Sequence, residues 1–210
     1  MKNNDTIEKR YVANDNIVKL DTPESRHVEG YALVFGEQSV DLGFFETINR
    51  SAVSQELVDS CDVFALLNHD PDKVLARSNS SLKLTVDERG LKYEFDAPNT
   101  DLGNELLEHI RRGEIDSSSF AFTVDWNDKD AQKWERRDGA NYRTINKINE
   151  ILDVSPCFKA AYSATSVSTR AIDKLEELRS EEEKSIEEAR KQEVMANLSL
   201  LKKEIEEMSI

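Results

Sequence analysis

Residues 81–98 read SLKLTVDERGLKYEFDAP, and this stretch decides the fold. Two runs in which apolar and polar residues alternate lie on either side of Asp87-Glu88-Arg89-Gly90. Alternation of this kind is typical of strands with one buried face, and a short polar segment ending in glycine is a common turn between them. The stretch therefore predicts a β-hairpin.

Similar short runs recur on both sides of the hairpin and predict further strands. They are HVEGYALVFG (27–36), GFFETI (43–48), DVFALLNHD (62–70), KVLARS (73–78), SSSFAFTVDW (117–126) and YRTINKINEILDVSP (142–156). Many short strands favour a closed β-barrel or a strongly bent sheet over a doubly wound fold. The expected class is α+β, mainly β, with flanking helices.

Two helices are predicted between these strands. Residues 51–60, SAVSQELVDS, begin with a serine that suits a helix cap. In residues 100–113, TDLGNELLEHIRRG, Thr100 or Asp101 is the expected cap and Gly113 the end. The polar residues 127–141 are expected to form a mobile loop.

The chain divides into three segments by composition. We expect a flexible N-terminal arm over 1–25, with at most one short strand near Tyr11, a core over 26–165, and an acidic helical tail over 166–210. The end of the tail carries an apolar stripe at spacings of three and four, formed by Val194, Leu198, Leu201, Ile205 and Met208. This stripe predicts a long helix with a face for a partner.

Composition excludes several classes of function. The 210 residues are 38% hydrophobic and 33% charged, and the net charge of −14 argues against coating a nucleic acid. No run is apolar enough to predict a signal peptide or a membrane span. Cys61 and Cys157 are expected to be free thiols in a reducing compartment, and zinc is not expected because no Cys-x-x-Cys spacing occurs.

Three serines in a row, in GEIDSSSFAF (113–122), raise the question of a nucleophile. Side chains alternate along a strand, so Ser118 shares a face with the two phenylalanines, while Ser117 and Ser119 point to the other face. A nucleophile needs a rigid backbone, small neighbours and an open face for substrate. This pattern leaves Ser117 and Ser119, although a half-exposed strand without any catalytic role alternates in the same way.

A serine nucleophile needs a base, and the chain offers three histidines. His109 lies within a predicted helix and His27 opens a strand. His69 ends the buried run VFALLNHD, where the chain passes from the core to a polar surface. Cys61 is a poor alternative nucleophile, because a straight strand would separate it from His69 by about 25 Å.

An acidic group that holds the histidine would complete a triad. Asp70, Glu150 and Asp153 are the candidates near predicted strand ends. Asp153 has apolar neighbours and, if ionised, needs a partner there. Backbone N–H groups could satisfy that need equally well, so the sequence leaves the third member open.

Residues 27–170 resemble the tailed-phage prohead proteases, also called capsid maturation proteases, which are serine proteases distantly similar in fold to the herpesvirus assemblins. The resemblance is carried by GYALVF (30–35), FETI (45–48), LLNHD (66–70), VLAR (74–77), RGEIDSSSFAF (112–122) and AAYSAT (160–165). In that family the histidine of Asn-His-Asp is the general base and the serine before Phe-x-Phe is the nucleophile. The resemblance therefore implies His69 and Ser119.

The chain departs from the family at the expected third member. Asp153-Val154-Ser155 stands where the family usually has Glu-Val-Ser, so the acidic side chain is one methylene shorter. In the assemblins the third member is a second histidine, which would have to be His27 or His109. If the family's acidic third member lies in this segment, the catalytic set that the resemblance implies is Ser119, His69 and Asp153.

The resemblance also implies a function. It is that of a serine endopeptidase that cleaves scaffold and major capsid proteins inside the assembling prohead in the host cytoplasm. It also implies self-processing, with the linker near 166–172 as a candidate site, and a homo-oligomer. No cofactor, metal, nucleic acid or membrane is implied. The alternative is a scaffolding or assembly protein with an inactive protease-like core and a helical interaction tail.

Overall fold

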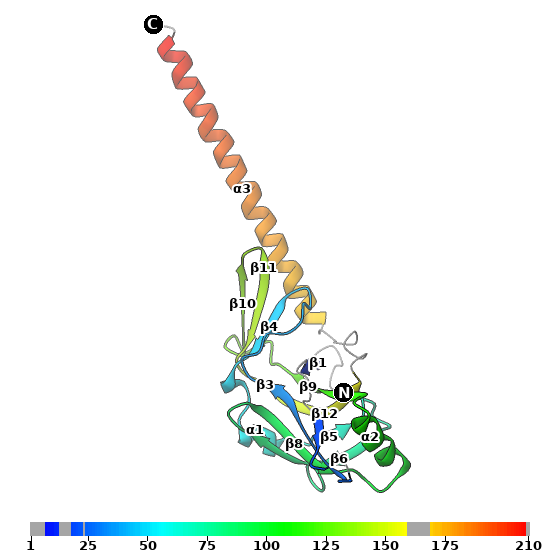
Figure 1. Cartoon of the computed structure of the whole chain (residues 1–210). Coiled ribbons are helices and arrows are strands. Elements are labelled where there is room, and N and C mark those ends of the chain that lie inside the picture. Colours follow the sequence, from blue (N-terminus) through cyan, green and yellow to red (C-terminus); the bar gives the residue numbers. More distant parts are fainter. Residues whose placement is uncertain (1–6, 13–17, 23, 159–168, 209–210) are drawn as a thin grey trace. The chain divides into compact units, whose positions relative to one another are not determined.

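A computed structural model describes residues 7–12, 18–22, 24–158 and 169–208, except the side chains of 169 and 200–208. The chain divides into two compact units, and the boundary between them in the sequence lies between Ser168 and Thr169. The first unit is mainly β, and the second is a single helix (Figure 1). The expected α+β class is therefore confirmed.

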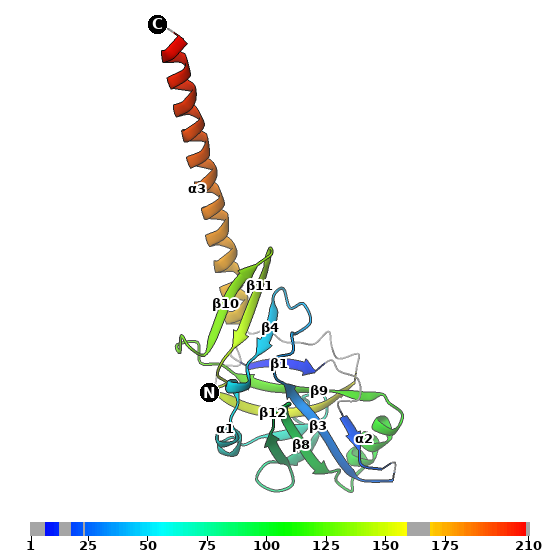
Figure 2. The same cartoon turned by 60° about the vertical axis from the view of Figure 1, so that its left-hand side comes forward.

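The described strands of the first unit form three open sheets (Figures 1 and 2). The five-stranded sheet has the order β1 (Ile7–Val12), β9 (Ile115–Thr123), β12 (Glu150–Phe158), β5 (Phe64–Leu66) and β6 (Val74–Arg77). The four-stranded sheet has the order β2 (Val18–Leu20), β3 (His27–Val34), β8 (Gly90–Asp96) and β7 (Lys83–Val86). The three-stranded sheet has the order β10 (Gln132–Arg137), β11 (Ala140–Ile145) and β4 (Phe45–Ile48). Of the two predicted architectures, the bent sheet is correct and the closed barrel is wrong.

The predicted hairpin over residues 81–98 is confirmed as β7 and β8. The side chain of Asp87 accepts hydrogen bonds from the backbone N–H groups of Arg89 and Gly90, which closes the turn. A Cβ atom at Gly90 would lie 1.8 Å from the carbonyl oxygen of Leu33. Only glycine therefore allows β8 to approach β3 at this point.

The core forms where the four-stranded and five-stranded sheets meet, with β3 contacting β1, β9 and β12. Phe120 and Phe122 of β9 are fully buried, and their rings stack at 4.7 Å. Tyr93 of β8 is also fully buried. These residues fix the face of β9 that packs against the core, which leaves the opposite face for other chemistry.

The predicted helices are also present. The first cap is Ser54 of α1 (Gln55–Ser60), three residues after the serine expected to cap it, and Thr100 caps α2 (Asp101–Arg111) as predicted. A short 3₁₀ turn, η2 (Arg50–Ala52), precedes α1. Gly113 follows α2 with a φ of 68°, a conformation that favours glycine.

The second unit is α3 (Thr169–Met208), one uninterrupted helix of 40 residues. Val194 and Leu198 of the predicted stripe are exposed on it. The side chains of Leu201, Ile205 and Met208 lie outside the described residues. None of the helices in the described ranges is long and apolar enough to cross a membrane.

Two expectations of irregular structure are wrong. Most of the predicted mobile loop over 127–141 is ordered, because β10 pairs with β11 across a turn. Within the predicted flexible arm, the short strand expected near Tyr11 is confirmed as β1, which pairs with β9, whereas β2, which pairs with β3, was not expected. Residues 159–168, which include the motif AAYSAT and part of the predicted self-cleavage linker, lie outside the described residues. The boundaries at 25 and 165 stay predictions.

Candidate active site

Ser119 lies in the middle of β9 and is flanked by a strand on each side. It pairs with Tyr11 of β1 and with Ser155 of β12. Phe120 and Phe122 hold the strand to the core, so Ser119 points to the opposite face of the sheet, as the alternation predicts. The hydroxyl is therefore attached to a backbone that hydrogen bonds fix from both sides.

His69 follows β5 in a turn with unusual backbone angles. Asn68 and His69 have φ values of 54° and 58°, in the left-handed region that non-glycine residues rarely adopt. The turn is held against β12, because the N–H of Asn68 donates to Pro156 at 3.2 Å. The N–H of Phe158 donates to the Asn68 side chain, also at 3.2 Å. These bonds aim the imidazole at β9.

Ser119, His69 and Asp153 form one connected chain of hydrogen bonds. Nε2 of His69 lies 2.5 Å from Oγ of Ser119, and Nδ1 lies 2.6 Å from Oδ1 of Asp153. Asp153 reaches the ring although its side chain is short. The register of β12 against β9 shifts between Ile151 and Asp153, and a β-bulge of this kind re-aims the side chain that follows it.

This geometry can support nucleophilic catalysis. A base at hydrogen-bond distance can take the hydroxyl proton, and a carboxylate on the far ring nitrogen holds the tautomer and stabilises the imidazolium that forms. Asp153 and His69 are both buried, with an exposed fraction of 8% each. Burial in a medium of low polarity strengthens both bonds.

The other sequence candidates lie elsewhere and have other partners. Oγ of Ser117 donates to Asp116, and Oγ of Ser118 donates to the hydroxyl of Tyr93. His27 contacts Asp96, and His109 contacts Glu114. Asp70 accepts a bond from the N–H of Asp72, and Cys61 accepts a weak bond from the N–H of Ile151.

The predicted open face at Ser119 is wrong, because Ser119 is fully buried. Its Oγ lies 2.9 Å from the carbonyl oxygen of Arg10 on β1. The ring of Tyr11 meets the imidazole of His69 edge-on, with centroids 5.9 Å apart. Burial, followed by the nearby Cys157 and Asp153, raises the pKa of Tyr11 to about 12. Ser119 is therefore closed to a peptide in this conformation, with Tyr11 of β1 paired beside it.

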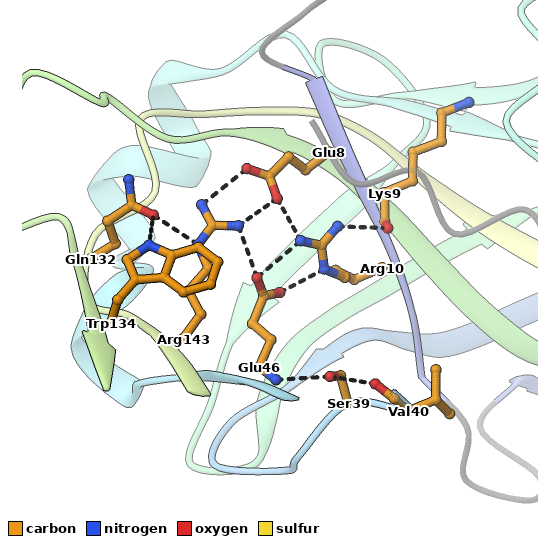
Figure 3. Close-up of polar contacts among 9 residues, drawn as sticks. All are labelled: Glu8, Lys9, Arg10, Ser39, Val40, Glu46, Gln132, Trp134 and Arg143. Carbon is orange, nitrogen blue, oxygen red and sulfur yellow. Dashed lines mark hydrogen bonds and ion pairs between the residues drawn. The ribbon is translucent and has the colours of Figure 1, made fainter. Parts of the chain in front are cut away.

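Four buried charges connect β1 to β4 and β11, and the sequence analysis missed them (Figure 3). Arg10 contacts Glu46 at 2.6 Å and also contacts Glu8. Arg143 contacts Glu8 at 2.6 Å and Glu46 at 2.9 Å. We call Glu8, Arg10, Glu46 and Arg143 the charge quartet. The available signal was Glu8 and Arg10 at i and i+2, which lie on one face of a strand.

Electrostatics within the charge quartet favour the ionised forms of Glu8 and Arg10. Burial raises the pKa of Glu8, but the charges of Arg143 and Arg10 outweigh burial and hold that pKa below its ordinary value. Burial lowers the pKa of Arg10, but the charges of Glu46 and Glu8 outweigh burial and raise that pKa above its ordinary value. The charge quartet is therefore a neutral set of two acids and two bases that ties β1 to its neighbours.

In the part of the chain that the structure describes, no group of three or more His, Cys, Asp or Glu side chains is arranged to hold a metal ion.

Comparisons with known proteins place the chain in context. A family model described as caudovirus prohead serine protease matches residues 15–179. Among solved structures, the bacteriophage T4 capsid assembly protease gp21 is similar at 12% identity and a TM-score of 0.45, covering 73% of this chain and 97% of that one. No curated protein matches the chain. Ser119, His69 and Asp153 all lie within the matched range, whereas β1 lies before it.

Proposed function

The chain belongs to the caudovirus prohead serine protease family, and from that premise we propose that it is a serine endopeptidase with Ser119 as its nucleophile. His69 is the general base, and Asp153 orients its ring. The supporting observation is the pair of short contacts that joins Asp153, His69 and Ser119 through the two ring nitrogens.

The reaction follows from these positions. His69 Nε2 takes the proton of Ser119 as Oγ bonds to the scissile carbonyl carbon. The imidazolium, stabilised by Asp153, then gives that proton to the leaving amine as the peptide bond breaks. Water repeats the sequence on the acyl-enzyme, releases the acid and restores the serine.

The proposed substrates are the scaffold and major capsid proteins of the assembling prohead, which is also the proposed location in the host. Self-processing near residues 166–172 and assembly into a homo-oligomer belong to the same proposal. The exposed Val194 and Leu198 of α3 support a role for the tail in protein contacts. The alternative, an assembly protein with an inactive core, has less support because the three candidate groups are in contact.

An activated serine can be tested by covalent labelling with an organofluorophosphonate, which reacts with serines that a base activates. We expect one phosphonyl group per chain, located on Ser119 by peptide mass mapping, and no label on Ser119→Ala. The matched control is Ser117→Ala, which lies on the same strand and should label like the parent. A label on another residue, or labelling that survives Ser119→Ala, would contradict the proposal.

Removal of β1 should speed this labelling, because β1 pairs with β9 at Ser119 and carries the Arg10 carbonyl and the Tyr11 ring that contact the site. Deletion of residues 1–12 removes Glu8 and Arg10 together, and Glu46 and Arg143 remain paired at 2.9 Å. No uncompensated charge is left behind.

If the open state is a minor one, populated at about 10% or less, the truncated chain should be labelled about tenfold faster or more. Truncation of residues 1–6, which spares β1, is the control and should leave the rate unchanged. An equal rate for both chains, with folding verified by circular dichroism, would show that β1 does not limit access.

A further inference from the structure

Ser155 is a fourth polar residue in contact with both His69 and Asp153. It is fully buried and lies on β12 directly opposite Ser119 on β9. Residues opposite each other in an antiparallel pair point to the same face of the sheet, and so do residues two apart on one strand. Asp153, Ser155 and Ser119 therefore all face His69.

The Ser155 hydroxyl joins the backbone of His69 to the carboxylate of Asp153. A hydroxyl has one proton to donate and lone pairs to accept. The proton goes to Oδ1 of Asp153 at 2.8 Å, and the oxygen accepts from the backbone N–H of His69 at 3.2 Å. Nδ1 of His69 lies 3.3 Å from this hydroxyl but 2.6 Å from Oδ1 of Asp153, so its proton goes to the carboxylate.

These bonds close a ring through one carboxylate oxygen. The backbone of His69 donates to Ser155, Ser155 donates to Asp153, and the side chain of His69 donates to the same oxygen of Asp153. The ring of bonds restrains the two movements that could misalign Asp153 and His69. One is rotation of the carboxylate, and the other is relaxation of His69 from its left-handed backbone, a conformation that is unfavourable for a residue with a Cβ.

We propose that Ser155 is a positioning residue for the reaction, acting through Asp153 and His69 without touching the substrate. The inference rests on the proposed function of Ser119, His69 and Asp153. When His69 takes the proton from Ser119, the new charge on the ring must find the carboxylate already aligned, because pre-set groups need no reorganisation at that moment. Ser155 supplies this alignment.

Ser155→Ala removes the hydroxyl and no other heavy atom, so both bonds are lost together. A hydrogen bond to a charged group is strong enough that we expect kcat to fall about 10- to 100-fold. KM should stay within about twofold, since Ser155 makes no contact with substrate. Ser155→Thr keeps the hydroxyl and should recover most of kcat.

The matched control is Ser118→Ala, which removes another fully buried hydroxyl one residue before Ser119. The hydroxyl of Ser118 bonds to Tyr93 and to the carbonyl of Ser155, on the core side of β9. Thermal unfolding should shift by a similar amount in both alanine variants, while only Ser155→Ala loses kcat. Equal kcat in the two variants would overturn the inference.

A second measurement is independent of turnover. The proton between Nδ1 of His69 and Asp153 should give a downfield NMR signal in the full chain and in Ser118→Ala. In Ser155→Ala the signal should broaden or disappear, because the carboxylate is no longer held. A sharp, unshifted signal in Ser155→Ala would contradict the positioning role even if no substrate is cleaved. If the parent chain cleaves no substrate, that result would instead contradict the proposed function.

Discussion

His69→Ala is expected to lower kcat about ten-thousand-fold or more, the loss typical of a triad deprived of its base. The hydroxyl of Ser119 is a weak nucleophile, and Nε2 of His69 is the basic atom at hydrogen-bond distance from it. The measurement is single-turnover cleavage of a peptide from a capsid or scaffold protein. His109→Ala is the matched control, because its partly exposed ring contacts Glu114 instead.

Substitution of Asp153 should also lower kcat, but by a smaller factor than His69→Ala. Asp153→Asn keeps the size of the side chain but offers no charge to the imidazolium, and we expect kcat to fall about a thousandfold or more. Asp153→Glu tests the fit of the shorter side chain. Since Oδ1 already lies 2.6 Å from Nδ1, an added methylene must displace the ring or the carboxylate. Asp153→Glu at full activity would show that the observed contact is not the one used in catalysis.

The second large effect is expected at Arg143, which is fully buried among the charge quartet. Arg143→Met leaves Glu8 and Glu46 with Arg10 alone, and so leaves one negative charge uncompensated in the core. Breaking a buried ion pair from one side costs about 3–5 kcal/mol, a large share of a typical domain's stability. Urea unfolding followed by circular dichroism measures the loss.

Two controls separate burial from charge in this experiment. Arg77→Met removes an arginine from an exposed pair with Asp62, and it should have a much smaller effect because water screens that pair. The double variant Glu8→Leu with Arg143→Met removes one acid and one base, so it should be less destabilised than the sum of the single variants. Additive losses would mean that the four charges are not coupled.

Low pH should weaken the ion pairs of the charge quartet. The pKa of folded Glu8 lies below its ordinary value of 4.5. Its contribution to stability is therefore complete above about pH 4.5 and is lost as the pH falls through the lower, folded pKa. Because Glu8 and Arg10 lie on β1, this loss weakens the attachment of the strand that pairs with β9 beside Ser119.

Local patterns were sufficient where one face of an element is plainly apolar. The hairpin of residues 81–98, the cap at Thr100 and the core side of β9 were predicted correctly, whereas the cap expected at Ser51 is formed by Ser54. Alternation also separated Ser118 from Ser119. The same rules failed for β10 and reached only part of β1, since buried charges and polar strand residues look like loop residues to any test based on hydrophobicity.

The sequence by itself determined which chemical groups are available and on which face of each strand they lie, because alternation and capping depend on neighbouring residues alone. Only the tertiary structure decided which groups meet. Residues 69, 119 and 153 become neighbours because β5, β9 and β12 lie in one sheet and a left-handed turn aims the histidine. The place of β1 beside Ser119 is likewise set by tertiary contacts, since Glu8 and Arg10 pair with Glu46 and Arg143, which are distant in sequence, and no local pattern records that attraction.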